Sequence, residues 1–209
     1  MQNKYLLPEK DQKPPISYRR LIKSYPHFTS VWLSEFISFV SDWFNTVAIY
    51  TAVQELSNSA QAIALVMVVK MLPGFLVAPL AGPLIDRYDR RKILLILDGI
   101  RFLSALALIP AYHFESLAGL YCLSFLMMGC EGVAAPAKST IVPMVVPKHH
   151  LATANALGGG TWSICLAIGA ALGGLVTQKL GISAAFFCDA LTFVCAFMLL
   201  WPLPPMPPK

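Results

Sequence analysis

The fold of this chain is decided by the stretch Gly82-Pro83-Leu84-Ile85-Asp86-Arg87-Tyr88-Asp89-Arg90-Arg91-Lys92. It holds two acids and four bases, and it lies between two apolar runs, Ala60–Ala81 and Ile93–Ala111. Each run is about as long as the roughly 20 residues that a helix needs to cross a bilayer core. The stretch is therefore predicted to be a short, rigid, basic turn between two membrane spans. Its excess of Lys and Arg places that turn on the cytoplasmic side.

The composition also indicates an integral membrane protein. Of the 209 residues, 56% are hydrophobic and 13% are charged, whereas soluble domains carry about 25% charged residues. The net charge of +5 requires no nucleic-acid partner, because the bases gather beside the apolar runs. All five cysteines lie inside apolar runs, where cysteine behaves as a small apolar residue, so we predict no disulfide, metal or other cofactor.

Six membrane spans are predicted, which makes this an all-α membrane protein: Val31–Val53, Ala60–Ala81, Ile93–Tyr112, Leu117–Ala137, Ala152–Val176 and Ile182–Leu203. They form one bundle over residues 28–203, between a polar tail (1–27) and a Pro-rich end (204–209). In the tail, Tyr18, Leu21, Ile22 and Tyr25 recur at helical spacing and predict a short interfacial helix. Most Lys and Arg residues lie in the tail and in the connections on one side of the predicted spans. Lys138 and Lys148 are assigned to one of these connections. This asymmetry predicts cytoplasmic termini in the plasma membrane, the inner membrane of a bacterium.

The opening stretch resembles the signature loop of the major facilitator superfamily of secondary transporters, Gly-x-Leu-x-Asp-Arg-x-x-Arg-Arg/Lys between the second and third helices. The matching residues are Gly82, Leu84, Asp86, Arg87, Arg90 and Arg91. Asp89 stands where the family usually has a second glycine. The resemblance implies the N-terminal six-helix half of such a transporter, built as a 3+3 inverted repeat. It is nearest to the branch of enterobactin and macrolide exporters and lysophospholipid transporters.

The fifth predicted span carries small residues at four-residue spacing, namely Cys165, Gly169 and Gly173, with Gly174 beside them. Such spacing lets two helix backbones approach closely. The segment also looks like the family's antiporter motif, with Ala170 in place of its proline. An ordinary packed helix pair without any role in export is the alternative interpretation.

The first predicted span carries a polar stripe of Glu35, Ser38, Asp42 and Asn45, which share one helix face. We expect this face to line a cavity, and a buried hydrogen-bonded seam is the alternative. Lys70 lies at the depth of Asp42 on the next span, so a salt bridge between them is predicted. Glu35 has no evident partner and is therefore the candidate for handling protons or cations.

Four further charges fall within the predicted spans, and we expect all of them to be structural: Asp98, Arg101, Glu131 and Asp189. Charges inside a membrane are costly and usually pair. Asp98 and Asp189 are the candidate partners of Arg101. Glu131 is expected to meet Arg90 or Arg91.

These patterns predict a secondary active transporter half that carries out ion-coupled efflux of a small molecule. Its expected partners are the lipid bilayer, the substrate, and either a C-terminal six-helix half or a second copy. No nucleotide-binding loop and no nucleophile–base pair is found in the sequence, so neither an ATP-driven pump nor an enzyme is predicted. A truncated, non-transporting fragment and a membrane interaction or assembly protein remain as alternatives.

Overall fold

The computed structural model describes residues 16–207, which form α-helices and one short 3₁₀ helix. In chain order these are α1 (Tyr18–Ser24), α2 (Pro26–Ser57), α3 (Ala60–Arg87), α4 (Arg90–His113), α5 (Leu117–Val145), η2 (Lys148–His150), α6 (Leu151–Leu180) and α7 (Ile182–Leu200). The short helix predicted near Tyr18 is α1, and α2 follows it almost directly. Residues 1–15 of the predicted tail and 208–209 of the Pro-rich end lie outside the described residues.

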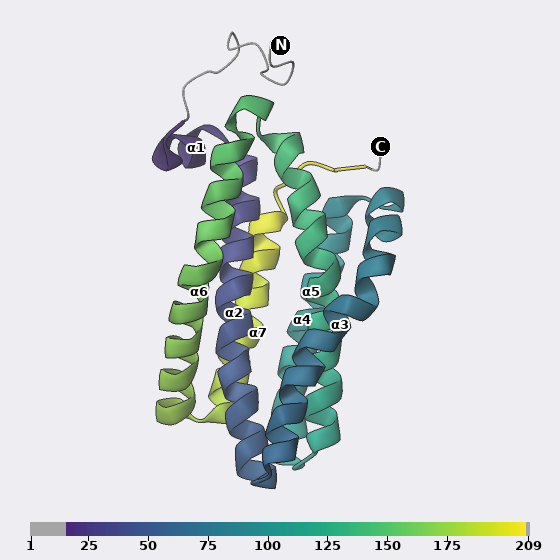
Figure 1. Ribbon diagram of the computed structural model, residues 1–209, viewed down its shortest axis with the longest axis vertical. Coiled ribbons are helices and arrows are strands. Elements are labelled where there is room, and N and C mark those ends of the chain that lie inside the picture. The colour runs from purple at the N-terminus through teal and green to yellow at the C-terminus, as the bar shows by residue number, and fades with distance from the viewer. Residues whose placement is uncertain (1–15, 208–209) are drawn as a thin grey trace, which may run out of the picture.

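The six long helices run up and down in one bundle (Figure 1). α2 packs against α6 and α7, α5 packs against α3 and α4, and α4 packs against α7. The turn between α3 and α4 and the segment after α7 lie at the end of the bundle that carries α1, which we call the α1 end (Figure 1).

The connections between the helices are short because single residues reverse the chain. At the end of the bundle opposite α1, Asn58 after α2 has a φ of 46° and Gly181 between α6 and α7 has a φ of 88°. Glycine adopts such angles without the steric cost that a Cβ atom brings. Ser116 caps α5 by accepting a hydrogen bond from the backbone N–H of Gly119 at 3.1 Å. The helices therefore start and stop within a few residues of one another.

α3 and α4 both extend into the signature stretch, and this corrects the prediction made for it. α3 continues to Arg87 and α4 begins at Arg90, so only Tyr88 and Asp89 form the turn. The basic loop predicted over Gly82–Lys92 is wrong, since most of it is helical. α3 keeps Pro73, Pro79 and Pro83 within the helix, and each removes a backbone donor; α3 is visibly bent in Figure 1.

Glycines bring two pairs of helices into backbone contact. A Cβ atom on Gly169 of α6 would lie 2.5 Å from the backbone oxygen of Val40 on α2, and one on Gly173 would lie 2.7 Å from that of Phe44. Cys165 lies in the same row and donates to the Phe36 carbonyl at 3.6 Å. The predicted close approach is found at these three residues. It is wrong for Gly174, whose Cβ would meet nothing within 4 Å.

The second seam joins α3 to α5. A Cβ atom on Gly132 would lie 3.3 Å from the Cα atom of Gly74. Both seams therefore depend on missing side chains, which allow the backbones of neighbouring helices to approach.

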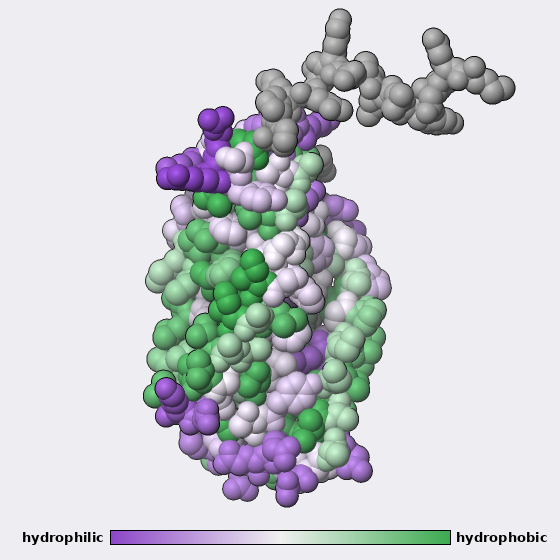
Figure 2. Space-filling view, turned by 60° about the vertical axis from the view of Figure 1, so that its left-hand side comes forward, coloured by the Kyte–Doolittle hydropathy of each residue, from purple (hydrophilic) through white to green (hydrophobic). Residues whose placement is uncertain are grey.

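Five helical segments are long and apolar enough to cross a membrane: Ala60–Arg87, Arg90–His113, Leu117–Val145, Lys148–Leu180 and Ile182–Leu200. Figure 2 shows hydrophobic side chains over the middle of one face of the bundle and hydrophilic ones at both of its ends. α2 is 32 residues long but is not among the five. Polar residues that it buries inside the bundle reduce its apolar character: Ser34, Ser38, Ser41 and Asn45.

The segment after α7 does not project from the bundle. Leu203 and Met206 are 2% and 3% exposed and belong to a core cluster with Val31, Ile85 and Leu94. Met206 of the predicted Pro-rich end is thus packed against the helices.

Candidate functional site

Three charged side chains from three helices meet in the interior of the bundle. Arg101 of α4 donates to Asp42 of α2 at 2.5 Å and to Glu131 of α5 at 2.6 Å. The Arg101 side chain is 0% exposed, and its guanidinium also lies 4.3 Å from the ring centre of Phe193. We call Asp42, Arg101 and Glu131 the charge junction.

The charge junction corrects three predicted pairings. Asp42 pairs with Arg101 and not with Lys70. Arg101 pairs with neither Asp98 nor Asp189. Glu131 meets Arg101 well inside α5, so the predicted contact with Arg90 or Arg91 is wrong.

Lys70 of α3 lies beside the charge junction but contacts uncharged groups. Its ammonium donates to the Thr46 hydroxyl at 2.6 Å, the Asp42 backbone oxygen at 3.3 Å and the Asn45 side-chain oxygen at 3.4 Å. The depth predicted from the sequence is right, because Lys70 reaches the level of Asp42. The two helices are rotated so that the Asp42 carboxylate faces α4 instead.

Asp189 of α7 is completely buried and is held by neutral donors. It accepts a hydrogen bond from the Ser41 hydroxyl and another from the Asn45 amide at 2.7 Å. Thr192 donates to Ser41 at 2.8 Å. Asn45 therefore links Asp189 to Lys70, since its amide nitrogen bonds the acid and its oxygen accepts from the base.

Lys138 is a buried base that the sequence analysis placed in a connection. It lies inside α5, is 1% exposed, and donates to Ser38 at 3.1 Å. Its neighbour in sequence, Pro136, lies within α5 and does not end it. The signal that could have found this residue is the apolar run Ile141–Val146 beyond it, which continues the helix.

The polar stripe of α2 divides into two kinds of position. Ser38 and Asn45 are buried and belong to the hydrogen-bonded interior. Glu35 and Asp42 are partly exposed and line cavities. Both predicted environments, the buried seam and the cavity wall, are therefore found on this one face.

The larger of the two cavities has a volume of about 640 Å³ and opens between α2, α3 and α5. Asp42, Lys70 and Glu131 line it together with apolar side chains. Trp43 and Trp162, two of its aromatic residues, meet edge to face with their ring centres 6.2 Å apart.

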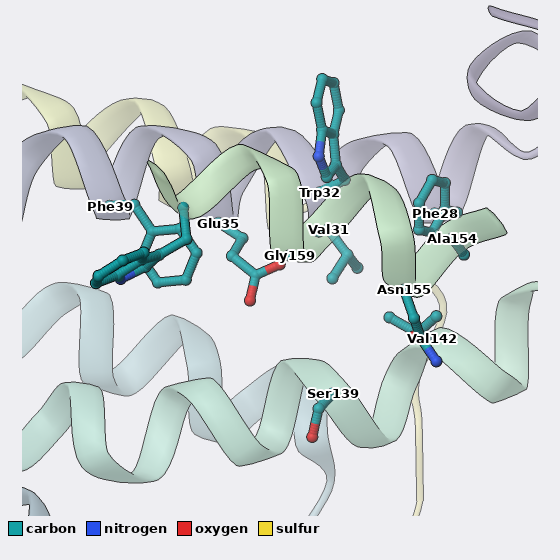
Figure 3. Close-up of a pocket in the computed structure, with 12 residues that line it drawn as sticks. Phe28, Val31, Trp32, Glu35, Phe39, Ser139, Val142, Ala154, Asn155 and Gly159 are labelled. Carbon is teal, nitrogen blue, oxygen red and sulfur yellow. The ribbon is translucent and has the colours of Figure 1, made fainter. Parts of the chain in front are cut away.

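The smaller cavity, of about 300 Å³, lies between α2, α5 and α6 and contains Glu35. Figure 3 shows the Glu35 carboxylate extending into the space between α2 and the helix that carries Ser139. Phe39 and Trp162 line both cavities, so the two are neighbours along α2.

Asp98 is the one predicted structural charge that stays without a bonded partner in the described chain. It is 2% exposed, and its Oδ2 atom makes no hydrogen bond. The same is true of Oε1 of Glu131, whose other oxygen binds Arg101.

The signature residues lie at the α1 end in two groups. Gly82, Asp86 and Arg87 are exposed near the end of α3, where Gly82 and Asp86 line a hollow with residues of α5, and Leu84 is partly buried. Arg90 is 5% exposed and begins α4.

The residue that departs from the family pattern has two specific contacts. Asp89 caps α4 by accepting from the Lys92 backbone N–H at 3.2 Å, and its second oxygen accepts from the Met206 backbone N–H at 2.9 Å. The Arg90 backbone N–H donates in return to the Met206 oxygen at 3.1 Å.

Two signature arginines bind the same returning segment. The Arg90 side chain donates to the Pro207 oxygen at 3.0 Å, and Arg91 donates to the Trp201 oxygen while its guanidinium lies 5.5 Å from the Trp201 ring centre. We call Trp201–Pro207 the strap.

Comparison with known proteins decides the family. The sequence model of the Major Facilitator Superfamily matches residues 31–209, which include all six long helices except the first turns of α2. The chain belongs to the major facilitator superfamily. The opening stretch thus identified the family correctly, although most of it is helical rather than a loop.

The relatives include exporters. The chain is 30% identical over 196 residues to the enterobactin exporter EntS of Shigella boydii, a match that covers 90% of this chain and 46% of that protein. It is 28% identical over 197 residues to EntS of Salmonella typhimurium, covering 90% of this chain and 47% of the relative. An uncharacterized transporter of the superfamily from Bacillus subtilis, YkuC, is 26% identical over 172 residues, covering 82% and 37%.

The chain spans less than half the length of these relatives. Family membership and the apolar helices indicate an integral membrane protein.

Proposed function

We propose that this chain is the N-terminal half of a secondary active exporter that couples efflux of a small molecule to ion movement. The observation that carries the proposal is the imbalance of charge inside the bundle. Away from the α1 end, where Arg90 and Arg91 bind the strap, five carboxyl groups of the described helices that are not fully exposed (Glu35, Asp42, Asp98, Glu131, Asp189) face only three such bases (Lys70, Arg101, Lys138). An uncompensated charge in a membrane interior is costly, so protons or bound cations must balance the excess acids.

Two oxygens support protons as that balancing charge. Oδ2 of Asp98 and Oε1 of Glu131 are buried and accept no hydrogen bond within the described chain. Burying a neutral carboxyl group without a hydrogen-bond partner costs far less than burying a charged carboxylate without one. Glu131 also lines the larger cavity, which gives a proton a route to it.

The helix packing supports a 3+3 inverted repeat and six spans. If α2, α3 and α4 form one triplet and α5, α6 and α7 the other, a twofold rotation exchanges the contact of α2 with α6 for that of α5 with α3. Both contacts are extensive, and a glycine seam is found in each. In this arrangement α2 crosses the membrane as well, in addition to the five apolar segments. Its polar side chains are tolerated because they face the bundle interior.

The exposed face of α3 supports a partner beyond these helices, either a C-terminal six-helix half or a second copy. Met67, Met71, Phe75 and Leu80 on this helix are all more than half exposed. Two halves moving about a site at the membrane midplane are the usual architecture for alternating access. With the basic ends in the cytoplasm, Asp86 would face the partner half and contribute to gating there.

Proton coupling can be tested in everted membrane vesicles that contain the protein at its natural length. Respiration acidifies the vesicle lumen, and a pH-sensitive dye reports proton release when a transported compound is added. Enterobactin, the compound in the name of the exporter relatives, is the first compound to add. We expect release with the natural protein and a loss of most of it in Glu131→Gln, which keeps an oxygen for Arg101.

Glu115→Gln is the matched control, because Glu115 is an exposed acid in the turn before α5 and should leave the signal unchanged. Uphill efflux that continues after a protonophore has collapsed the gradient would contradict proton coupling.

A further inference from the structure

The smaller cavity has an acid that the protein itself does not neutralise. Glu35 is the one ionisable side chain among its described lining residues. Within residues 16–207 it takes part in no hydrogen bond or salt bridge, although its neighbours on the polar stripe do. A partly buried carboxylate without a partner loses hydration and gains nothing in return.

The nearby bases are already committed to other oxygens. The charge of Lys138 acts on Glu35, but its ammonium is buried and bonded to Ser38. Lys70 lines the other cavity and donates to Thr46 and its neighbours. Arg101 is paired with Asp42 and Glu131. Glu131 adds a second negative charge that acts on Glu35, so the cavity favours positive ligands.

Aromatic side chains surround the acid along α2. Figure 3 shows Phe28 and Phe39 on either side of Glu35. Trp32 also lines the cavity, and its orientation is fixed because its indole N–H donates to Thr161 at 3.0 Å. The faces of such rings attract cations, and this attraction strengthens when water is excluded.

The wall opposite α2 offers only uncharged polar groups. Ser139 of α5 and Asn155 of α6 line it. They can accept hydrogen bonds from an ammonium ligand without adding positive charge.

From this arrangement we infer that the smaller cavity binds an organic cation, with its ammonium at the Glu35 carboxylate and its apolar part against the aromatic rings. A cavity of about 300 Å³ is at the lower end of the size range of small-molecule sites. Larger cations extend past Phe39 and Trp162 into the larger cavity, where Met67, Met71 and Met128 provide an adaptable apolar surface.

This inference rests on the proposed transport function for its physiological meaning, since it names the class of compound carried. Its test measures binding at equilibrium and needs neither a proton gradient nor translocation. A failure of coupling in the vesicle experiment and a failure of cation binding are therefore separate results.

The probe is phenyltrimethylammonium, and the comparison ligand is tert-butylbenzene, which has the same shape but no charge. Binding to the protein at its natural length in lipid nanodiscs is measured by titration calorimetry, with empty nanodiscs subtracted. We expect saturable binding of the cation and at least about tenfold weaker binding of the neutral compound, because the ion pair forms in a partly desolvated site.

Glu35→Gln should weaken binding of the cation by on the order of tenfold and leave that of tert-butylbenzene unchanged. Glu115→Gln, which removes an equal charge from an exposed turn, should change neither. Phe39→Leu should weaken cation binding by a few-fold through the lost ring face.

Equal affinity for the two ligands in the unmodified protein would overturn the inference, and this comparison requires no variant to fold. Unchanged cation binding in a folded Glu35→Gln protein would overturn it as well.

Discussion

The contacts on the two sides of α2 are stabilised by different interactions. Against α6, α2 presents bare backbone, and the missing side chains of Gly169 and Gly173 bring the helices into contact. Toward α4 and α5, α2 presents the Asp42 carboxylate, which is bound through Arg101 to Glu131. The first contact depends on shape, and the second depends on charge.

Because of this difference, we expect the contacts on the two sides of α2 to respond differently to protons and ligands. Gly169 and Gly173 have no titratable side chain and line neither cavity, so a proton or a ligand does not act on their contact with α2 directly. The charge junction borders the larger cavity. Protonation of either acid would remove one of the two ion pairs that Arg101 forms. We therefore expect α2 and α6 to move as one body, with changes in conformation arising on the side of α4 and α5.

The largest expected effect comes from removing the base of the charge junction. Arg101→Met leaves Asp42 and Glu131 without their partner in the interior. Breaking a buried ion pair in this way costs about 3–5 kcal/mol, which should appear as a lower free energy of unfolding in detergent.

Arg91→Met is the control, because this arginine binds the strap from the surface and its loss should matter far less. Adding Asp42→Asn and Glu131→Gln to Arg101→Met should recover much of the stability. Equal melting of the Arg101→Met and Arg91→Met proteins would show that the charge junction does not stabilise the bundle.

An intermediate effect is expected from filling the glycine seam. Gly173→Ala places a methyl group within 2.9 Å of both the oxygen and the Cα atom of Phe44, so α6 must move away from α2. Overpacking of this kind costs about 1–3 kcal/mol, measured by thermal unfolding followed by circular dichroism.

Gly174→Ala is the matched control one residue further on, with open space at its Cβ. Alanine favours a helix over glycine by about 1 kcal/mol, so this variant should be unchanged or slightly more stable. The same loss of stability in both variants would refute the shape-based seam.

The smallest effect is expected from Lys70→Met. The lysine donates only to neutral oxygens, and its loss also removes the cost of keeping an ammonium in the membrane interior. These contributions oppose each other, so stability should change by no more than about 1 kcal/mol.

Double-mutant cycles sharpen this comparison. The coupling energy between Asp42 and Arg101 should exceed that between Asp42 and Lys70, because only the first pair joins two charged groups directly. A larger coupling energy between Asp42 and Lys70 would instead support the salt bridge that the sequence predicts.

The sequence predicts the helices and their depths better than it predicts their rotation. Apolar runs and short polar breaks located all six long helices, and four-residue spacing located the α6 side of the α2–α6 seam. Lys70 was the only partner predicted for Asp42, and its pairing with Arg101 instead depends on how α2, α3 and α4 are turned about their axes. No pattern within one helix contains that information.

The ends of α3 and α5 were predicted too early in the chain, for a reason unrelated to helix rotation. Lys138 and the signature residues up to Arg87 looked like parts of connections because charge interrupts the apolar runs there. Both lie in helices that continue through Pro136 or Pro83. Lys138 is stabilised there by Ser38 of α2, a contact between residues a hundred positions apart.

Because the strap is bonded to the turn between α3 and α4, a label attached to the strap reports the position of that turn. The Met206 backbone N–H donates to the Asp89 carboxylate and its carbonyl accepts from the Arg90 backbone N–H, and its side chain is packed in the core. A spin label or fluorophore placed beside Met206 would therefore follow the turn between α3 and α4 rather than the axis of α7. The Pro207 oxygen is held at the same turn, because it accepts a hydrogen bond from the Arg90 side chain.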